Sequence, residues 1–538
     1  MLGAPGETTL VMAPPPDRRG AVADFLRLNP GERPRLAVAT PREIRRALIE
    51  RWAPALTRRA VRAVLDRDPG QSAASAPAPG QLLALGVAVA VWGLALWGAV
   101  SPIVMAWTCA FLMIGLFRML VADARPPVAP SPVDDADLPR YAVLVPVFRE
   151  VEVIAPLVAA LSALDYPPDR LEIRLVVEAD DGPTRAAAEA ATLDTPLDIV
   201  VVPPSLPRTK PKALNFALAT VDAEFVTVYD AEDRPDPDQL RLAVAAFRAG
   251  PPELAVVQAA LVIDHDARAR PWLVRQFEIE YAMLFRGLLP WLAERRLFLP
   301  LGGTSNHFRR SVLDVIGGWD PHNVTEDADI AVRIVRAGWH AGVVASATRE
   351  EAPIDLRAWL AQRTRWMKGW MQTWLAHMRS PLRLHRELGL AGALAFHLVF
   401  AGQLLSAITF APSLLLLSLQ IGGFVPLFVG ETIDGDVVAL SALVAFSSGL
   451  LGAFILAMKV SERSPRRFRL ADVLSMPLYW CAVSLATYTA AIELIHAPSR
   501  WNKTRHGRAV REGDARPPCT TPPGEGMRKH ARAGVVQR

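Results

Sequence analysis

The 538-residue chain has little of what a secreted, disulfide-stabilised protein contains. It has three cysteines, too few for a disulfide framework, and two of them, Cys109 and Cys481, lie within apolar stretches. No apolar run comes before residue 82, so we expect no secretory signal. Only 21% of the residues are charged while 51% are hydrophobic, which excludes disorder as the main state because this much apolar surface has to be buried. We therefore predict a membrane protein whose polar parts stay in the cytosol.

Lysine is missing from residues 1–80, yet these residues carry a net charge of +5 from arginine. Residues 498–538 carry +7, so both ends of the chain are basic. Basic ends beside membrane spans favour a cytoplasmic location and attract anionic lipid. No nucleic-acid recognition motif accompanies them, so we expect no nucleic-acid partner. Region 1–80 is predicted to be cytosolic, helical around 41–65 and a flexible linker over 70–80, and its sequence indicates no chemistry.

Long uncharged runs flank the central part of the chain. Residues 82–100 and 103–122 are each long enough to cross about 30 Å of hydrocarbon, and they predict a transmembrane hairpin. Residues 388–429 and 437–458 predict two further crossings. The segment 474–495 lies between two basic clusters that both belong on the cytosolic side, so we predict that it lies in the membrane interface. Four crossings result, and six are the main alternative.

Between residues 140 and 351, short apolar runs alternate with helical stretches. The runs at 141–147, 173–177, 199–202 and 225–229 are rich in β-branched and aromatic residues and have the length of strands. This alternation predicts an α/β fold with a mostly parallel sheet. Ligands bind beyond the carboxyl ends of such strands, and carboxylates follow three of these four runs.

The acidic string DAED (230–233) directly follows the last of these predicted strands. Carboxylates at a strand end suit a hard cation such as Mg²⁺ or Mn²⁺, which neutralises a diphosphate leaving group. A solvated turn is the alternative. Lys210 and Lys212 either add positive charge for that phosphate or belong to a basic loop that caps the next helix.

Two strings farther along the chain also contain residues that could act in catalysis or bind a sugar. TED (325–327) precedes a helical stretch, so it either caps that helix or supplies a general base for an attacking hydroxyl. The four tryptophans of residues 357–379 fall on one helical face, which predicts an amphipathic helix in the membrane interface, with a helix packed on the soluble core as the alternative. Within this helix, QRTRW (362–366) either binds a sugar by stacking and hydrogen bonds or anchors the helix in the membrane.

Taken in order, these strings resemble those of the processive family 2 glycosyltransferases, which include bacterial cellulose synthase catalytic subunits, chitin synthases and hyaluronan synthases. The matching strings are VPVFRE (145–150), EADDG (178–182), KALN (212–215), DAED (230–233), GTSNHFRR (303–310), TED (325–327) and QRTRW (362–366). The resemblance covers about residues 140–507. It implies a GT-A glycosyltransferase domain on the cytosolic side, flanked by transmembrane and interfacial helices. It also implies inverting transfer from a nucleotide sugar such as a UDP-sugar, and extension of a β-linked polysaccharide coupled to export.

The resemblance also implies roles for individual residues. Those expected to contact the nucleotide sugar are Pro146, Phe148, Glu150, Asp180, Asp181, Lys212 and Asp230. Those expected to hold Mg²⁺ or Mn²⁺ are Asp230, Glu232 and Asp233. Asp327, with Glu326 beside it, is expected to be the catalytic base. Those expected to bind the acceptor are Gly303, Thr304, Gln362, Arg365 and Trp366, and a gating-like loop is expected to contain Trp501, Lys503, Thr504, His506 and Gly507.

Three departures from the family pattern leave the sugar and the linkage open. Glu232 stands where the family usually has aspartate, so Asp233 is the other candidate for second metal ligand. His506 stands where cellulose synthases have lysine. We also expect no C-terminal cyclic-dinucleotide-binding domain.

The predicted regions after the hairpin are a catalytic domain (140–356), an interfacial helix (357–387), a membrane region (388–496), a gating-like loop (497–510) and a disordered basic tail (511–538). We place the chain in a bacterial-type inner membrane as a multi-pass protein in contact with membrane lipid, a growing glycan or lipid acceptor, and an export partner. The nearest rival function is transfer of a single sugar to a lipid carrier or glycolipid. A transporter or an inactive binding protein is the rival from another class, and a transporter is disfavoured because the predicted spans are almost free of charge.

Overall fold

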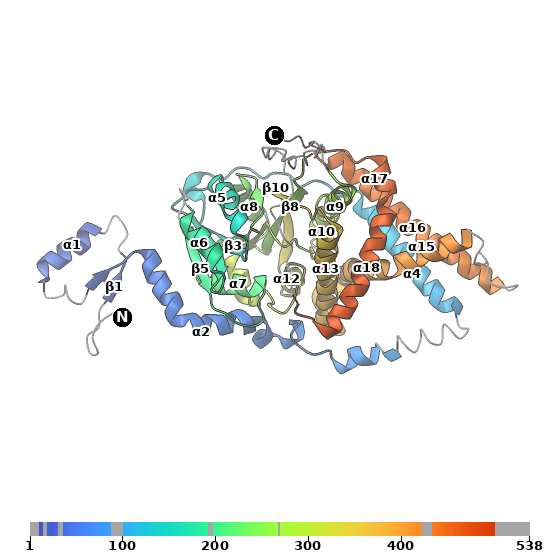
Figure 1. The fold of residues 1–538 in the computed structure, drawn as a ribbon, viewed down its shortest axis with the longest axis horizontal. Coiled ribbons are helices and arrows are strands. Elements are labelled where there is room, and N and C mark those ends of the chain that lie inside the picture. The colour runs from blue at the N-terminus through green and yellow to red at the C-terminus, as the bar shows by residue number, and fades with distance from the viewer. Residues whose placement is uncertain are drawn as a thin grey trace, which may run out of the picture.

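Three regions follow one another along the molecule: an N-terminal region, an α/β domain and a bundle of long helices (Figure 1). This computed structural model describes residues 10–13, 19–30, 36–84, 86–87, 100–191, 197–266, 270–421 and 433–500. The N-terminal region and the helical bundle lie at opposite ends of the α/β domain.

An eight-stranded sheet forms the centre of the α/β domain, in the order β5-β4-β3-β6-β9-β8-β10-β7. The strands are β3 (Tyr141–Val147), β4 (Leu171–Glu178), β5 (Leu197–Val202), β6 (Phe225–Val228), β7 (Arg234–Pro235), β8 (Leu254–Ile263), β9 (Asn306–Arg309) and β10 (His340–Glu350). Only β9 and the two-residue β7 pair antiparallel with their neighbours. The four strands predicted from the sequence correspond to β3, β4, β5 and β6, so the α/β fold with a mostly parallel sheet is confirmed.

Alternate side chains of the central strands face two separate helical layers. Ala142 and Leu144 of β3 belong to the same buried cluster as Phe216 of α7 (Lys210–Leu218). Val143 and Val145 belong to a second cluster, which contains side chains of α5 (Ile154–Ser162) and α8 (Gln239–Ala249). Covering both faces of the sheet explains why the strands read as nearly continuous apolar runs. The helices of this domain are η4 (Asp135–Asp137), η5 (Val151–Val153), α5 (Ile154–Ser162), α6 (Gly182–Ala190), α7 (Lys210–Leu218), α8 (Gln239–Ala249), α11 (Arg310–Ile316) and α12 (Glu326–Arg336).

Long helices and short helical segments pack against one side of the α/β domain and against one another. They are α4 (Val100–Val121), α9 (Trp272–Ala282), η6 (Met283–Leu288), α10 (Leu289–Glu294), α13 (Leu356–His377), α14 (Pro381–Phe396), η7 (His397–Ala401), α15 (Gly402–Ile421), α16 (Ile433–Arg463), α17 (Leu470–Leu474) and α18 (Met476–His496). A Cβ on Gly115 of α4 would lie 2.8 Å from the Ser448 carbonyl oxygen of α16, and one on Gly452 would lie 2.6 Å from the Gly115 carbonyl oxygen. These two glycines therefore allow close contact between the backbones of α4 and α16, as small residues do in membrane helix pairs.

Two segments in the described part of the chain, Pro381–Leu419 and Met476–His496, are long and apolar enough to cross a membrane. The first coincides with the crossing predicted over 388–429. The second is α18, which we predicted to lie in the membrane interface. Its length and composition also suit a membrane crossing. Residues 103–122 and 437–458 lie mostly within α4 and α16. Most of the first predicted crossing, residues 88–99, lies outside the described residues.

The N-terminal region is attached to the α/β domain. It contains α1 (Arg19–Leu28), α2 (Pro41–Arg67), η3 (Pro69–Gln71) and a parallel pair of strands, β1 (Leu10–Met12) and β2 (Leu36–Val38). The predicted helix is α2, whose Ala60 carbonyl accepts a hydrogen bond from Asn215 Nδ2 of α7 (3.0 Å). The prediction of a flexible linker over 70–80 is wrong, because Arg379 donates hydrogen bonds to the carbonyls of Gly70 and Ser72 (3.2 and 2.7 Å), and Asp320 accepts one from the Ala73 N–H (2.6 Å).

Candidate active site

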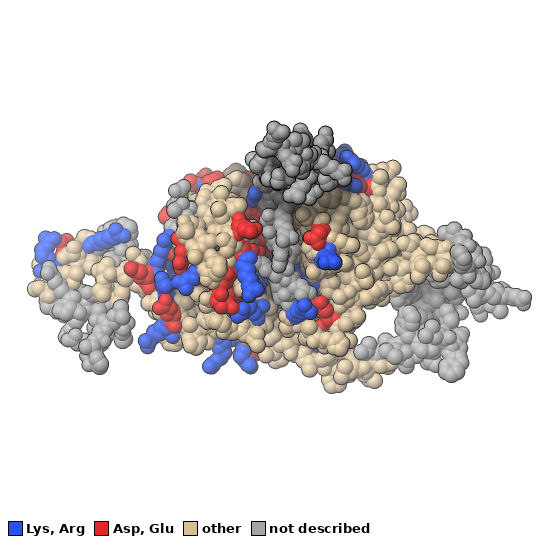
Figure 2. Space-filling view, in the orientation of Figure 1, with Lys and Arg blue, Asp and Glu red and all other residues tan. Residues whose placement is uncertain are grey.

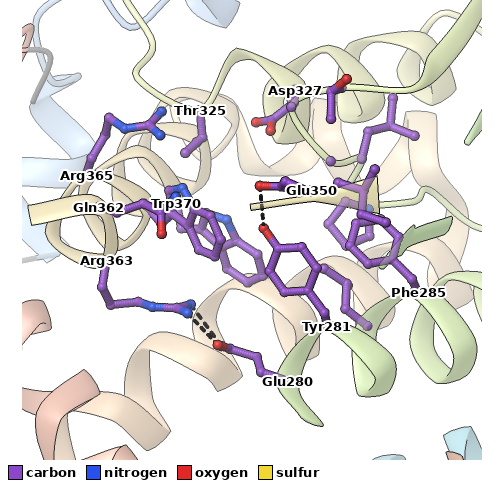
Figure 3. Close-up of a pocket in the computed structure, with 18 of the residues that line it drawn as sticks. Glu280, Tyr281, Phe285, Thr325, Asp327, Glu350, Gln362, Arg363, Arg365 and Trp370 are labelled. Carbon is purple, nitrogen blue, oxygen red and sulfur yellow. Dashed lines mark hydrogen bonds and ion pairs between the residues drawn. The ribbon is translucent and has the colours of Figure 1, made fainter. Parts of the chain in front are cut away.

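A cavity of about 570 Å³ lies between the carboxyl ends of the strands and the helical bundle (Figure 3). Acidic side chains from four strand ends line it: Glu150 after β3, Glu178 at the end of β4, Asp230 after β6 and Glu350 at the end of β10. Side chains from the start of α12 and from α13 line it as well. Parallel strands end at the same edge of a sheet, which is why residues far apart in the sequence meet here.

The structure brings only some of the predicted nucleotide-binding residues into this cavity. Those that line it are Pro146, Phe148, Glu150 and Asp230. Asp180 instead pairs with Arg208 near the surface (2.7 Å). Asp181 is the N-cap of α6 and accepts hydrogen bonds from the backbone N–H groups of Thr184 (3.4 Å) and Arg149 (2.5 Å). Asp181 therefore caps α6 and also holds the loop after β3.

Lys212 does not reach the cavity, contrary to its predicted role. Its side chain is fully buried and its Nζ contacts Glu178 (2.8 Å). Lys210 lines the cavity, where its Nζ pairs with Asp230 and donates a hydrogen bond to the Gly303 carbonyl (2.6 Å). Residues two apart on a helix point to different sides, so only one of the two lysines at the start of α7 can face the strand ends. Lys210, and not Lys212, is therefore the lysine whose ammonium group lies in the cavity.

The three carboxylates of the DAED string point in different directions. Asp230 and Glu232 line the cavity. Asp233 turns back toward its own loop, where its Oδ2 accepts hydrogen bonds from the Asp230 N–H (2.7 Å) and from Thr304 Oγ1. Its Oδ1 is buried and has no hydrogen-bond partner in the described part of the chain. Asp233 therefore shapes the turn, and Glu232 is the neighbour of Asp230 that faces the cavity.

The oxygens of Asp230 and Glu232 fit a divalent cation. Burial, together with the charges of Asp230 and Asp233, raises the pKa of Glu232 well above its usual value, and a bound cation would lower this pKa by favouring the carboxylate. Among the described residues, no three acidic, histidine or cysteine side chains form a complete set of metal ligands. Mg²⁺ does not require one, because it is commonly held by one or two carboxylates with waters and substrate phosphates as its other ligands.

The predicted base lies at the start of α12. The side chain of Thr325 makes no capping hydrogen bond among the described residues, whereas Asp327 Oδ1 accepts one from the Ala328 N–H (2.8 Å). Glu326 and Asp327 both line the cavity. Burial raises the pKa of Asp327, and burial together with the charge of Asp327 raises the pKa of Glu326 to about 7. One oxygen of Asp327 thus accepts a hydrogen bond from the first turn of α12, and the other lies beside Gly303.

Gly303 marks the point where the reactive groups converge. A Cβ built on this glycine would lie 3.3 Å from Asp327 Oδ2, 3.8 Å from Lys210 Nζ and 4.0 Å from Asp230 Oδ2. Any side chain here would occupy the space between these three groups. The glycine therefore leaves room for a substrate where a carboxylate, an ammonium group and the candidate metal ligand meet.

Helix α13 carries Gln362, Arg365 and Trp366 into the same cavity, but the helix does not lie free at a surface. Trp359 on its tryptophan face is fully buried, and its Nε1 donates a hydrogen bond to the Tyr479 hydroxyl of α18 (3.0 Å). Trp366 packs against Tyr281 of α9, with ring centroids 6.2 Å apart. The structure favours the alternative, a helix packed on protein, because Trp359 and several polar side chains of α13 are buried and its other three tryptophans are half-buried.

Helix α13 also fixes the turn that leads into the predicted base. The Val324 N–H donates a hydrogen bond to Gln372 Oε1 (3.1 Å), and Arg365 donates one to the Val324 carbonyl (3.5 Å). A side chain at Gly369 would collide with Thr325, so this glycine allows α13 to lie directly on the turn. The contact between α13 and this turn thus fixes the candidate base relative to the predicted acceptor residues.

Sequence reasoning missed Glu350 and Tyr281, which face each other in the cavity (Figure 3). The Tyr281 hydroxyl donates a hydrogen bond to Glu350 Oε1 (3.2 Å). Burial, with the charges of Asp233 and Asp230, raises the pKa of Glu350 to about 8. The rule that functional residues follow strands would have found Glu350, but the end of β10 is polar and is not recognisable as a strand.

The residues of the predicted gating-like loop lie outside the described residues; they are Trp501, Lys503, Thr504, His506 and Gly507. The segment just before them contacts α13. Lys368 Nζ donates a hydrogen bond to the Arg500 carbonyl (2.9 Å), and Gln372 Nε2 donates one to the Pro498 carbonyl (3.0 Å).

Comparison with known proteins agrees with this arrangement. Residues 139–369 match the model of a family described as "Glycosyltransferase like family 2". The chain is 29% identical over 287 residues to a probable glycosyltransferase, YdaM, of Bacillus subtilis, a match that covers 52% of this chain and 66% of the relative. It is 28% identical to a beta-monoglucosyldiacylglycerol synthase of Synechocystis, a match that covers 53% of this chain and 58% of the relative. It is 27% identical to a UDP-forming cellulose synthase catalytic subunit of Xanthomonas axonopodis, a match that covers 53% of this chain and 38% of the relative.

Each match spans less than two thirds of the relative's own length. The matched region begins just before β3 and ends within α13, so it contains the sheet, the cavity-facing carboxylates and the QRTRW string. The sheet topology is the mostly parallel α/β arrangement expected of a GT-A domain. Residues 139–369 of this chain are a family 2 glycosyltransferase domain.

Proposed function

We propose that the chain transfers a sugar from a nucleotide-sugar donor to a hydroxyl group, with inversion at the anomeric carbon. One observation carries this proposal: Asp327, Lys210 and Asp230 converge on Gly303, which has no side chain to fill the space between them. A general base, a cation for the leaving diphosphate and a candidate metal ligand are thereby placed around one point. Gln362, Arg365 and Trp366 line the same cavity and are the residues we propose for the acceptor.

In this mechanism Asp327 accepts the proton of the attacking hydroxyl. The acceptor oxygen forms a bond to the anomeric carbon as the bond from that carbon to the diphosphate breaks. Lys210 stabilises the negative charge that develops on the diphosphate, since its ammonium group lies in the cavity beside Asp230 and Gly303. Burial opposes a charged Lys210, but Asp230 and Glu326 more than offset this and raise its pKa, so Lys210 stays protonated.

Mg²⁺ or Mn²⁺ would be held by Asp230 and Glu232, and when bound it would neutralise charge on the diphosphate. Pro146, Phe148 and Glu150 would contact the nucleotide from the end of β3. Thr304 would act through Asp233, whose carboxylate it binds, to hold the loop that carries Asp230.

We further propose that the helical bundle lies in a bacterial-type inner membrane, with the α/β domain on the cytosolic side. On the face shown in Figure 2, charged residues gather over the N-terminal region and the α/β domain, whereas the surface over α15, α16 and α18 is almost entirely other residues. Two apolar segments of this bundle have the length of a crossing. More than two crossings, including the four predicted from the sequence, remain part of this proposal.

For the acceptor, the proposal is a growing β-linked polysaccharide, with an export partner to receive it. A lipid or glycolipid acceptor is the second candidate, and one observation favours it: the cavity continues between bundle helices, where apolar side chains line it. These include Ile114 and Phe117 of α4, Leu288 of η6, Val399 of η7 and Leu456 of α16. Such a lining suits a hydrocarbon chain better than a polysaccharide.

The test is an assay of the purified chain in lipid nanodiscs with labelled UDP- and GDP-sugars, supplied one at a time with Mg²⁺ or Mn²⁺. The proposal expects one donor to be consumed, with release of the nucleoside diphosphate. Label in long polymer supports the polysaccharide, and label in a single-sugar lipid product supports the second candidate. If no donor is consumed, the proposed function is wrong.

A further inference from the structure

We propose that Glu350, held by Tyr281, hydrogen-bonds a hydroxyl group of the transferred sugar and thereby selects the nucleotide sugar that the chain accepts. This inference rests on the proposed function, because it assigns a specificity-determining residue to the same cavity. The ligand is identified by chemistry alone: a pyranose hydroxyl beside the anomeric carbon that loses the diphosphate.

The backbone fixes Glu350 firmly at the edge of the sheet. It is the last residue of β10, in register with Ile263 of β8, and its carbonyl accepts a hydrogen bond from the Asp264 N–H (2.9 Å). Its side chain lines the cavity and is only 8% exposed. The backbone that carries this carboxyl group therefore cannot move far without breaking the sheet.

Tyr281 orients one oxygen of this carboxyl group. The Tyr281 ring lies between aromatic neighbours, with centroids 4.6 Å from Phe277, 5.5 Å from Phe285 and 6.2 Å from Trp366. Its hydroxyl donates to Glu350 Oε1 (3.2 Å). The close packing of its ring means that the hydroxyl has one position available, directed at Glu350 (Figure 3).

The other oxygen, Glu350 Oε2, is buried and has no hydrogen-bond partner in the part of the chain that the structure describes. Leaving such an oxygen unpaired costs free energy, and a ligand hydroxyl in the cavity would satisfy it. A site built to hydrogen-bond a substrate hydroxyl also discriminates strongly against an analogue that lacks it.

The position of Glu350 favours the donor sugar over the acceptor. On one side it interacts electrostatically with Asp230, Asp233 and Lys210, which belong to the diphosphate end of the cavity. On the other side its partner Tyr281 packs on Trp366, which belongs to the proposed acceptor end. The transferred sugar has to occupy the space between the leaving diphosphate and the attacking hydroxyl, and Glu350 lies between the groups proposed for each.

The test compares kcat/KM for nucleotide sugars that differ at single hydroxyls, such as UDP-glucose, UDP-galactose and UDP-N-acetylglucosamine. We expect Glu350→Ala to lower kcat/KM on the preferred donor by about 10- to 100-fold, the range for leaving a buried hydrogen-bonding group without its partner. The ratio between the preferred donor and its epimer should fall, while affinity for free UDP or GDP stays as in the wild type. Glu350→Gln, which retains a hydrogen-bonding group, should lose less.

Two further variants keep the test decisive. Tyr281→Phe removes only the hydroxyl that orients Glu350, so it should reduce selectivity in the same direction by a smaller factor, and it carries the test if Glu350→Ala does not fold. Glu294→Gln, at an exposed carboxylate of α10 that does not line the cavity, is the matched control and should behave as the wild type. Unchanged donor ratios in Glu350→Ala and Tyr281→Phe, with sugar transfer intact, would overturn this inference alone. No transfer by the wild type with any donor would instead overturn the proposed function.

Discussion

One wall of the cavity holds its functional groups on residues that directly follow strands, whereas the opposite wall holds them on one long buried helix. Asp230 and Glu232 follow β6, and the end of this strand brings them to the cavity. Arg365 and Trp366 of α13 depend on contacts with α9, α12 and α18. We therefore expect substitutions at the strand-end wall to change the chemistry in a folded protein, and substitutions in α13 to change acceptor binding and packing together.

A large effect should separate the two aspartates at the ends of the DAED string. Asp230→Ala removes the proposed metal ligand that faces the cavity, so we expect turnover to fall by about 10²- to 10³-fold, the cost of removing one strong electrostatic contact from a transition state. A chelator should have the same effect on the wild type. Asp233→Asn keeps the turn residue's shape and should retain most activity. If Asp233→Asn is inactive and Asp230→Ala is active, the assignment of the two carboxylates is wrong.

The two lysines of α7 provide the next comparison. Lys210→Met should lower turnover with a smaller change in melting temperature than Lys212→Met, because its partner Asp230 is more exposed than Glu178 and lines the cavity. Lys212→Met leaves the Glu178 carboxylate buried without its partner, which costs about 3–5 kcal/mol of folding free energy. Thermal unfolding and steady-state kinetics on both variants measure this difference. The same phenotype for both would contradict the separation seen in the structure.

The strand-end wall could be predicted from the sequence more completely than the wall formed by α13. Apolar runs mark β3 and β6, so the residues that follow them, Glu150 and Asp230, could be recognised without any tertiary information. Which of Lys210 and Lys212 faces the cavity depends on the rotation of α7 about its axis, and no pattern in the sequence specifies that rotation.

The sequence left two alternatives open for the tryptophans of α13, for a different reason. A tryptophan face beside cationic residues looks the same in sequence whether lipid or protein covers it. Here Arg363 pairs with Glu280 (2.8 Å), and Tyr479 donates a hydrogen bond to the same carboxylate (2.6 Å). These partners lie far from α13 in the sequence, so the burial of the helix becomes evident only in the folded chain.

Trp366 tests the wall formed by α13. Trp366→Ala removes a flat apolar surface worth about 1–3 kcal/mol to a bound acceptor. This corresponds to roughly a 5- to 150-fold loss of acceptor retention. We expect shorter products or more free sugar, seen by mass spectrometry, while affinity for the nucleotide changes less. Trp52→Ala on α2, where the indole is 54% exposed, is the matched control. Unchanged product length in Trp366→Ala would remove this residue from the acceptor site.

A further expected effect is on the pH dependence of stability. The pKa of Glu350 is raised to about 8 in the folded chain, mainly by burial, against about 4.3 for glutamate in an unfolded chain. Between these values the folded state binds more protons than the unfolded state, so the contribution of this group to the free energy of unfolding falls as pH rises. Melting temperatures of the metal-free protein from about pH 5 to about pH 8 should therefore decline less steeply for Glu350→Gln than for the wild type. Equal slopes would show that this carboxyl group is not held protonated by burial.

The central claim is that Asp327 activates an acceptor hydroxyl for displacement at the anomeric carbon beside Gly303. The most direct measurement follows the reaction of the preferred α-linked nucleotide sugar by NMR, for the wild type and for Asp327→Asn, with UDP or GDP affinity measured on both proteins. We expect the wild type to form a β-linked product, and Asp327→Asn to bind the nucleotide normally while losing about 10²- to 10⁴-fold in turnover. An α-linked product, or undiminished transfer by Asp327→Asn, would contradict this claim.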